Sequence, residues 1–340
     1  MAAPPAMSRR IVATRLSASF RDATEIRLGP VPAVFKPTEV LVKNRFVGVN
    51  ASDINFTAGR YKPDVNPPFD CGFEALGEVV AVGSNVKDFF VGEAVVTQSY
   101  GAFAEYQTVP SRQAKKVPSL KKEWLPLDLS GTTASISLGE VAKPQVGEVA
   151  IVTAASGGTG QFAVQLLKKV YRCFVIGVTS SPTKEAFLKE LGCDSVIVDQ
   201  RESVDEGIKR IAPTGVNLAY ESVGGEMFES IVKNIALRGR ILSIGSISGY
   251  NDGSSWIQRA SNYTPIQTRL LSKSATLHAF FLPHFGKYAR RHFSTLCEHY
   301  ESGLIKSSVD PFPFKGLEAV PDAVDYMYAR RNKGKIIVEI

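Results

Sequence analysis

Between residues 129 and 282, the sequence alternates short apolar runs with segments that can form helices. The first four runs are EVAIVTAA, CFVIGVTS, DSVIVD and VNLAYESVG, each followed by a helical segment, and GRILSIGSI and ATLHAFFL come after them. Apolar strands alternating with helices are typical of a parallel sheet, because the crossover helices cover both of its faces. We therefore predict an α/β fold with a doubly wound parallel sheet in this part of the chain.

The two ends of the chain differ from this middle part. The first third contains short β-like runs broken by Gly, Pro and Asn, such as VLVKNRFVGVN and GEVVAVGS, which favours a compact β-rich unit. After Leu282 come a helical segment, a Pro-rich stretch, a second helix and a last strand, KIIVEI. A chain of 340 residues is long enough for two domains. We therefore expect domain boundaries near residues 129 and 282.

A glycine-rich turn, AASGGTG, follows the first apolar run of the predicted parallel sheet. Ala155, Gly157 and Gly160 occupy the three fingerprint positions of a dinucleotide site, with Gly158 and Thr159 between the last two. Gly157 would let the backbone approach a pyrophosphate, Gly160 would let the next helix pack closely on its strand, and the helix N-terminus would favour negative charge. Because the turn joins a predicted strand to a predicted helix, it predicts a dinucleotide-binding site.

The end of the second strand indicates which dinucleotide binds. An NAD site usually carries an acid there for the ribose hydroxyls, but VTSSPTK has none and contains Ser180, Ser181 and Lys184. Ser181 before Pro182 predicts a helix start, which places Lys184 in the first turn, where the macrodipole disfavours a cation. A bound phosphate would reverse that penalty, so we predict the 2'-phosphate of NADP here. A surface lysine beside a capping serine is the alternative.

Composition argues against several other functions. The four cysteines form no C-x-x-C pair, and the four histidines lack the spacing of a helical zinc pair, so neither a disulfide framework nor a structural zinc lobe is expected. The net charge of +7 comes from scattered basic pairs without interleaved aromatics, which favours a solvated surface over nucleic-acid binding. No run of 18 apolar residues and no targeting signal occurs. We expect a cytoplasmic protein, or a peroxisomal one if a C-terminal signal was trimmed.

A series of motifs runs over nearly the whole chain: GVNASDINFTAGRY, GFEALGEVVAVG, GAFAEY, SGTTA, AASGGTGQFAVQL, ESVGG, GRILSIGSISGY and NKGKIIVEI. In this order they resemble the medium-chain dehydrogenase/reductase family, in its zinc-independent quinone-oxidoreductase and enone-reductase branch. The resemblance implies a GroES-like catalytic domain formed by both chain ends, residues 1–128 and 283–340. It also implies a Rossmann NADP-binding domain, residues 129–282, inserted between them, and a substrate cleft at their junction. It also implies a homodimer joined through Rossmann edge strands, with ATLHAFFL as the edge.

The resemblance implies further contacts with the nucleotide and its nicotinamide. These residues are Thr132 or Thr133, Glu221, Ser222, Gly245 to Tyr250, Phe280, Phe281, Leu282, Asn332 and Lys333. One position departs from the family pattern, since relatives often have a Tyr that packs on the adenosine 2'-phosphate where this chain has Asp199. An acid that pointed inward would repel the phosphate.

Two positions that bind zinc in alcohol dehydrogenases of this family carry other residues. Asn50 stands where those enzymes have a Cys, and Phe73, in DCGFEALGEVVAVG, stands where they have a His. A phenyl ring has no lone pair to donate to zinc, so we expect no metal. Phe73 would instead form an apolar wall beside the nicotinamide, whereas the sequence leaves the role of Glu74 open.

Without the Lewis acidity of zinc, an activated C=C bond is an easier acceptor than an isolated carbonyl, because the charge that develops on an enone oxygen needs only hydrogen-bond donors. We predict NADPH-dependent reduction of α,β-unsaturated ketones, and the resemblance implies 15-keto-prostaglandins. Asn50 would orient substrate or nicotinamide, and Tyr61 or Tyr250 would hold the carbonyl or deliver a proton. A turn-forming Asn and packed tyrosine rings are the alternatives.

Two other functions remain open. A quinone or enoyl-thioester reductase would use the same nucleotide site, and a non-catalytic NADPH-binding protein would keep the nucleotide without turnover. The loops at residues 60–69 and 250–265 are expected to shape the substrate cleft, so they decide among these substrates.

Overall fold

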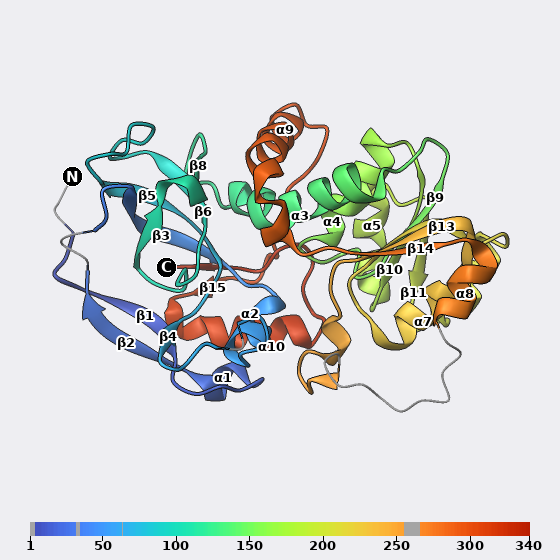
Figure 1. Ribbon diagram of the computed structural model, residues 1–340, viewed down its shortest axis with the longest axis horizontal. Helices are drawn as coiled ribbons and strands as arrows, with labels where there is room; N and C mark the ends of the chain where they lie inside the picture. Colours follow the sequence, from blue (N-terminus) through green and yellow to red (C-terminus); the bar gives the residue numbers. More distant parts are fainter. Residues whose placement is uncertain (1–3, 32–34, 63, 255–265) are drawn as a thin grey trace. The chain divides into compact units, whose positions relative to one another are not determined.

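The computed structural model divides into two compact units, each described here by itself (Figure 1). Unit 1 comprises Met1–Leu129 and Val309–Ile340, and unit 2 comprises Ser130–Ser308. The structure describes residues 4–31, 35–62, 64–254 and 266–340. Parts of the two loops expected to shape the substrate cleft, residues 63 and 255–265, lie outside the described residues.

Unit 2 is built around a six-stranded sheet in the order β11-β10-β9-β12-β13-β14, and every strand pair in it is parallel. The strands are β9 (Val149–Val152), β10 (Phe174–Thr179), β11 (Ser195–Val198), β12 (Val216–Glu221), β13 (Ile235–Ser243) and β14 (Thr276–Ala279). This is the doubly wound order, which changes winding direction between β9 and β12 and binds ligands beyond the carboxyl ends of the strands there. The predicted parallel sheet is confirmed, and β14 is an edge strand as expected.

The helices that connect these strands are α4 (Gly160–Gln165), α5 (Glu185–Leu191), α6 (Val204–Ile211), α7 (Gly225–Lys233) and α8 (Ile266–Lys273). α3 (Thr132–Ile136) precedes β9, and α9 (Ala289–Glu301) follows β14. Ile151, Ile176 and Ile241, on three of the strands, pack in one buried cluster with Ile208 of α6 and Ile231 of α7. Burying these continuous apolar runs on the sheet is the main source of stability in unit 2.

The chain leaves unit 2 at residue 308 and not at residue 282, because the segment between these residues packs on unit 2. On α9, His292 Nδ1 lies 2.8 Å from Ser135 Oγ of α3, and its Nε2 lies 3.0 Å from Glu140 Oε1. Near the end of this segment, the side-chain amides of Gln161 and Gln165 on α4 donate to the backbone carbonyls of Ser308 and Lys306. Residues 283–308 therefore belong structurally to the parallel-sheet unit, which differs from the expected boundary at 282/283.

Unit 1 is β-rich and combines both ends of the chain. Its larger sheet has the order β15-β16-β3-β5-β6-β8, with β7 also paired to β3, and its smaller sheet has the order β2-β1-β4. The strands are β1 (Met7–Ala13), β2 (Thr24–Pro30), β3 (Glu39–Gly48), β4 (Phe69–Asp70), β5 (Glu74–Val82), β6 (Ala94–Gln98), β7 (Tyr106–Pro110), β8 (Ala114–Lys116), β15 (Phe314–Lys315) and β16 (Ile337–Glu339). Its helices are α1 (Phe20–Ala23), α2 (Ser52–Thr57) and α10 (Val320–Tyr328).

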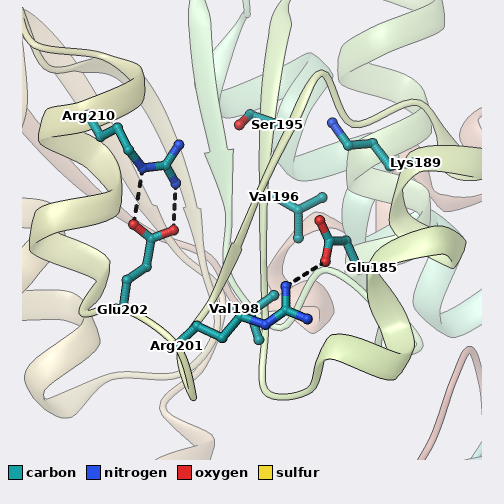
Figure 2. Close-up of a pocket in the computed structure, with 8 residues that line it drawn as sticks. All are labelled: Glu185, Lys189, Ser195, Val196, Val198, Arg201, Glu202 and Arg210. Carbon is teal, nitrogen blue, oxygen red and sulfur yellow. Dashed lines mark hydrogen bonds and ion pairs between the residues drawn. The ribbon is translucent and has the colours of Figure 1, made fainter.

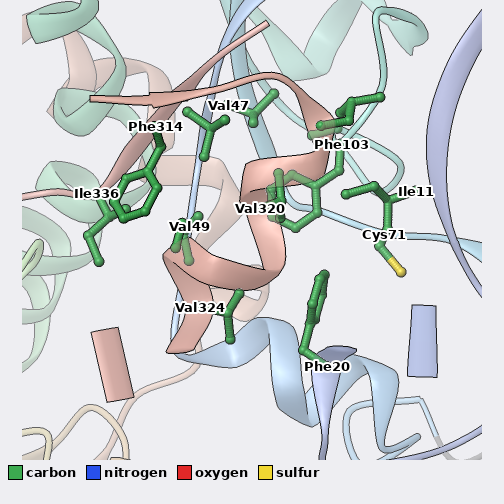
Figure 3. Close-up of a cluster of buried hydrophobic side chains, with 14 of the residues drawn as sticks. Ile11, Phe20, Val47, Val49, Cys71, Phe103, Phe314, Val320, Val324 and Ile336 are labelled. Atoms are coloured by element: carbon green, nitrogen blue, oxygen red, sulfur yellow. The ribbon is translucent and has the colours of Figure 1, made fainter. Parts of the chain in front are cut away.

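The core of unit 1 joins side chains from the two ends of the sequence. Figure 3 shows Val320 and Val324 of α10 among residues of the N-terminal part, including Val47, Phe20 and Phe103. β16 pairs antiparallel with β3, with Val338 opposite Val47. The predicted β-rich unit formed by both chain ends is confirmed. Within the part of the chain that the structure describes, no helix is long and apolar enough to cross a membrane.

Candidate active site

The glycine-rich turn lies at the carboxyl end of β9, beside the point where the sheet changes winding direction. Ala154 has a φ of +46°, and the N–H of Ala155 donates to Val178 O of β10 at 3.0 Å. α4 begins at Gly160, where an added Cβ would lie 2.8 Å from Ala155 Cα and closer still to Ala154 O. Because only a hydrogen fits there, the helix packs directly on the strand end, and the turn 155–159 forms the kind of backbone cradle that takes a pyrophosphate.

The loop after β12 is pinned to the end of β9 by Glu221. This buried carboxylate accepts hydrogen bonds from the N–H groups of Val223 at 2.7 Å and Gly224 at 2.9 Å, and from Thr153 Oγ1 at 3.3 Å. Burial raises the pKa of Glu221, and the two backbone donors act against that shift. Ser222 donates its N–H to Thr153 Oγ1 at 2.8 Å. Glu221 therefore fixes the loop backbone, and its carboxylate is turned into the protein.

The segment 245–250 follows β13 at the same edge of the sheet. Tyr250 is buried, and its hydroxyl oxygen accepts the N–H of Ser246 at 3.0 Å. A Cβ on Gly245 would lie 2.9 Å from this oxygen, so the glycine makes room for the phenol. After β14, Phe280 is buried and Phe281 is exposed. The residues that the sequence assigns to the nucleotide in 155–160, 221–222, 245–250 and 280–282 thus lie at or soon after the carboxyl ends of β9, β12, β13 and β14.

The end of β10 has the local structure that the sequence predicts. Ser181 caps a 3₁₀ turn, Pro182–Lys184, and its Oγ accepts the N–H of Thr183 at 3.3 Å. Lys184 is buried in this first turn, which runs into α5. The N–H of Asp199 donates to Thr179 O at 3.0 Å, so the backbone of this acid lies beside the end of β10, at the residue that precedes Ser180.

In unit 1, Asn50 is held in a network of buried polar side chains. Its Nδ2 donates to Glu74 Oε1 at 2.9 Å and to Gly48 O at 3.2 Å, and its Oδ1 accepts from Lys335 Nζ at 2.6 Å. Lys335 also forms an ion pair with Glu74, and both side chains are almost completely buried. Both amide hydrogens of Asn50 are therefore engaged within unit 1, and Glu74, whose role the sequence leaves open, is the partner of Lys335.

Asp53 extends this network. Its Oδ2 accepts the N–H of Asn50 at 2.8 Å, whereas its buried Oδ1 has no hydrogen-bond partner among the described residues. Burial raises the pKa of Asp53 to about 8, opposed by the Asn50 N–H and Lys335 and reinforced by the charge of Glu74. Asp53 is therefore mostly protonated at neutral pH, which leaves the Lys335–Glu74 pair as the charged part of the network.

Phe73 lies in a cluster of aromatic rings. Phe56 stacks on Tyr100 with ring centroids 4.5 Å apart, and Phe73 lies 5.4 Å from Phe56 and 5.1 Å from Tyr100. Tyr100 is half exposed. Burial, and secondarily its electrostatic interaction with Tyr61, raise the pKa of Tyr100. The surroundings of Phe73 within unit 1 are thus aromatic.

The side chains at positions 50 and 73 do not fit a zinc site. The amide of Asn50 is occupied by Glu74, Gly48 and Lys335, and the ring of Phe73 packs among aromatic rings. The described residues contain no group of three or more His, Cys, Asp or Glu side chains arranged to hold a metal ion.

Sequence reasoning missed three residues of unit 1 that surround the predicted site: Asp53, Tyr100 and Lys335. Lys335 carried a local signal, because it is a charged residue at the start of the apolar run KIIVEI, two residues after the predicted contact Lys333. Asn332 itself donates its side-chain amide to Gly334 O at 3.0 Å. Thr132, the remaining predicted contact, is fully buried at the start of α3 in unit 2.

Two family models match the chain. One is described as the alcohol dehydrogenase GroES-like domain and matches residues 36–119, and the other is described as zinc-binding dehydrogenase and matches residues 158–294. The first match lies in unit 1 and the second in unit 2.

Curated relatives are similar over almost the whole chain. Prostaglandin reductase-3 of Bos taurus is 47% identical over 99% of this chain and 90% of its own length. A probable quinone oxidoreductase of Leishmania amazonensis is 44% identical over 99% of both chains. Among solved structures, a quinone oxidoreductase of Pseudomonas syringae has a TM-score of 0.84 at 25% identity, and a mycobacterial protein complexed with NADPH has 0.83 at 26% identity; both matches cover 98% of this chain and 100% of theirs.

Proposed function

The chain belongs to the medium-chain dehydrogenase/reductase family, and on that premise we propose that it is an NADPH-dependent reductase of the conjugated C=C bond of α,β-unsaturated ketones, with 15-keto-prostaglandins as substrates. One observation carries this proposal. At the two positions where zinc-dependent relatives bind their metal, this chain has an amide saturated by Glu74, Gly48 and Lys335, and a phenyl ring packed on Phe56. When an enone accepts a hydride, the negative charge is delocalised to its carbonyl oxygen, where hydrogen-bond donors can stabilise it without a metal ion.

The residues of unit 2 support NADP(H) as the cofactor. The turn 155–160 would take the pyrophosphate, with Gly157 and Gly160 allowing close approach. Ser180, Ser181 and Lys184 would take the 2'-phosphate, and the segment 245–250 with Phe280, Phe281 and Leu282 would line the nicotinamide. A bound NADPH supplies a hydride. The mycobacterial relative complexed with NADPH shares this fold at 26% identity, which adds support.

The protein's own part in the reaction is to stabilise the charge that develops on the carbonyl oxygen and to provide a proton. Tyr61 and Tyr250 are the proposed donors, one in each unit. Asn50 would orient the substrate or the nicotinamide through packing and not as a hydrogen-bond donor, because both of its amide hydrogens are already engaged. The aromatic cluster of Phe56, Phe73 and Tyr100 offers an apolar surface against which an enone could pack.

Reduction of quinones is the second candidate function. It is favoured by the 44% identical relative from Leishmania amazonensis, a probable quinone oxidoreductase, and by the exposed ring of Tyr100, which could stack on a flat acceptor. Reduction of an enoyl thioester and a non-catalytic role in NADPH binding are further alternatives. A cytoplasmic location and a homodimer joined through β14 complete the proposal.

The test compares NADPH consumption with a 15-keto-prostaglandin, a simple quinone and an enoyl thioester. We expect the highest kcat/KM with the 15-keto-prostaglandin, and loss of the C=C bond with retention of the ketone in the product. Consumption of the quinone alone would replace the first proposal by the second. Binding of NADPH without consumption of any acceptor would leave only the non-catalytic role.

The two tyrosines can be separated by Tyr61→Phe and Tyr250→Phe. The variant that removes the proton donor should lose about 10²-fold or more in kcat, because general acid catalysis commonly contributes that much, while its affinity for NADPH stays the same. Equal kcat in both variants and the parent would exclude both phenols as proton donors.

A further inference from the structure

The turn after β11 places an arginine near the end of β10. These strands are parallel neighbours, with Thr179 paired to Val198, so the residues after both strands leave the sheet at the same edge. The N–H of Arg201 donates to Val198 O at 2.8 Å, which turns the chain back at once. Arg201 is therefore retained at this edge, close to the residues that follow β10.

The side chain of Arg201 points to the start of α5. Its Nη1 donates to Glu185 Oε2 at 3.0 Å, and Glu185 directly follows Lys184 (Figure 2). Both side chains are well exposed, at 59% for Arg201 and 40% for Glu185. An exposed ion pair of this kind contributes little to stability. The guanidinium of Arg201 can therefore leave Glu185 for a more strongly charged group such as a phosphate, or bind both at once, with a small loss of free energy.

The formal charges at this edge cancel in pairs, Lys184 against Asp199 and Arg201 against Glu185, so net charge alone does not attract a phosphate dianion. Attraction depends instead on hydrogen bonds that the cations donate directly to the phosphate oxygens. Arg201 adds a positive charge in the form of a planar fork of N–H donors, which matches phosphate oxygens. Of these donors, the contacts described for Arg201 engage only Nη1.

We propose that Arg201 is a specificity-determining residue of the nucleotide site, whose guanidinium binds the adenosine 2'-phosphate of NADP(H) together with Lys184 and offsets the charge of Asp199. Glu185 holds the guanidinium near the site when no phosphate is bound. This inference rests on the nucleotide part of the proposed function and is independent of the acceptor that is reduced.

Arg201 and Glu185 line a surface groove of unit 2 that also contains a second ion pair, and this pair offers a matched control. Arg210 Nη2 donates to Glu202, with similar exposure, and both residues line the groove with Arg201 and Glu185. In Figure 2, this pair lies across β11 from the Arg201–Glu185 pair, away from the start of α5. Arg210→Ala therefore removes an equally exposed arginine without affecting the proposed phosphate contact.

The experiment measures dissociation constants by calorimetry for NADPH and NADH, and for 2',5'-ADP and 5'-AMP as probes of the adenosine half. We expect Arg201→Ala and Arg201→Gln to weaken binding of NADPH and 2',5'-ADP about tenfold, the effect of losing one charge-assisted hydrogen bond, with NADH and 5'-AMP unchanged. Glu185→Gln should strengthen NADPH binding, because it removes a competing carboxylate. Arg210→Ala should leave all four constants within about twofold of the parent.

The two proposals fail in different ways. If the parent binds NADPH and NADH equally, the NADP preference of the proposed function is wrong, and with it the role of Arg201. If the parent prefers NADPH but the Arg201 variants keep that preference, or lose NADH affinity by the same factor, the inference about Arg201 alone is overturned.

Discussion

At the scale of single residues, the most consequential feature is a lysine and a glutamate buried side by side in unit 1. Lys335 and Glu74 have side-chain exposures of 3% and 0%. Removing two charges from water is costly, and Lys335 and Asn50 offset this cost at Glu74 Oε1, whereas the buried Oε2 has no hydrogen-bond partner among the described residues. The pair thereby fixes which end of the Asn50 amide faces which neighbour.

Lys335→Met should destabilise unit 1 by about 3 to 5 kcal/mol, because it leaves the carboxylate of Glu74 buried and unpaired. The double variant Lys335→Met/Glu74→Gln should recover much of that loss. Urea unfolding of the single and double variants measures both effects. Lys306→Met, which breaks an exposed pair with Glu190, serves as the control and should cost no more than about 1 kcal/mol. A Lys335 variant as stable as that control would contradict the charged state of Glu74.

Asp53→Asn should change how stability depends on pH. The pKa of Asp53 rises from 3.8 to about 8 on folding, so the folded protein holds a proton that the unfolded chain releases between these values. Stability should therefore fall as pH rises from about 4 to about 8, by at most about 1.4 kcal/mol per pH unit for one proton, and level off above.

The amide introduced by Asp53→Asn would keep an acceptor for the backbone N–H of Asn50 and would lack this titration. Thermal unfolding from about pH 5 to about pH 9, a range that spans the upper part of the expected titration, should show a flatter profile for Asp53→Asn than for the parent. The exposed Asp88→Asn is the control and should follow the parent. Parallel profiles for parent and Asp53→Asn would show that Asp53 is ionised in the folded protein.

At the scale of elements, the turn between β9 and α4 is the part of the site that local sequence determines most completely. Its glycine spacing and flanking apolar runs are close together in the sequence, and Ser181 with Pro182 likewise predicts the observed cap after β10. The domain boundary could not be obtained in this way. It depends on contacts such as that between His292 and Ser135, 157 positions apart in sequence, which local patterns do not encode.

Gly160→Ala should strain the junction of β9 and α4. The added Cβ would meet the backbone of Ala154 and Ala155, which cannot move aside as a flexible side chain can. We expect a loss of about 1 to 3 kcal/mol in stability together with weaker NADPH binding, measured by urea unfolding and calorimetry.

Gly286→Ala provides the matched control in the same unit, because a Cβ there would meet nothing within 4 Å. Its stability should stay within about 0.5 kcal/mol of the parent. Equal behaviour of the two variants would mean that the helix does not need close approach at Gly160.

At the scale of the whole molecule, residue types at the site were predictable from sequence, whereas the networks that hold them were not. Asn50 and Phe73 could be singled out from their motifs. Their partners could not, since Lys335 reaches Asn50 across 285 positions of sequence and only the pairing of β16 with β3 brings them together. The parallel sheet was predictable because each of its strands is apolar by itself, whereas its edge at β14 was implied by the family resemblance and is seen in the observed strand order.

The exposed edge at β14 leads to a prediction about assembly. Leu277 on this strand is 42% exposed, and an open edge strand can pair with a second copy. Leu277→Lys should convert the proposed homodimer to a monomer in sedimentation velocity. Pairing of two β14 strands would bury the introduced lysine without a charged partner, which is costly. Phe90→Lys, at an exposed position of unit 1, should leave the dimer intact. A parent that sediments as a monomer would contradict the proposed dimer.

The construction of unit 1 from both chain ends sets the order in which a nascent chain can fold. Unit 2 is continuous, so all of its strands are available once residue 308 has been synthesised. The first part of unit 1 precedes unit 2 in the sequence, yet the Phe46–Gly48 end of β3 lacks its β16 partner until residues 337–339 have been synthesised. Glu74 likewise waits for Lys335. The surroundings of Asn50, encoded near the start of the chain, are thus among the last parts of the protein to form during translation.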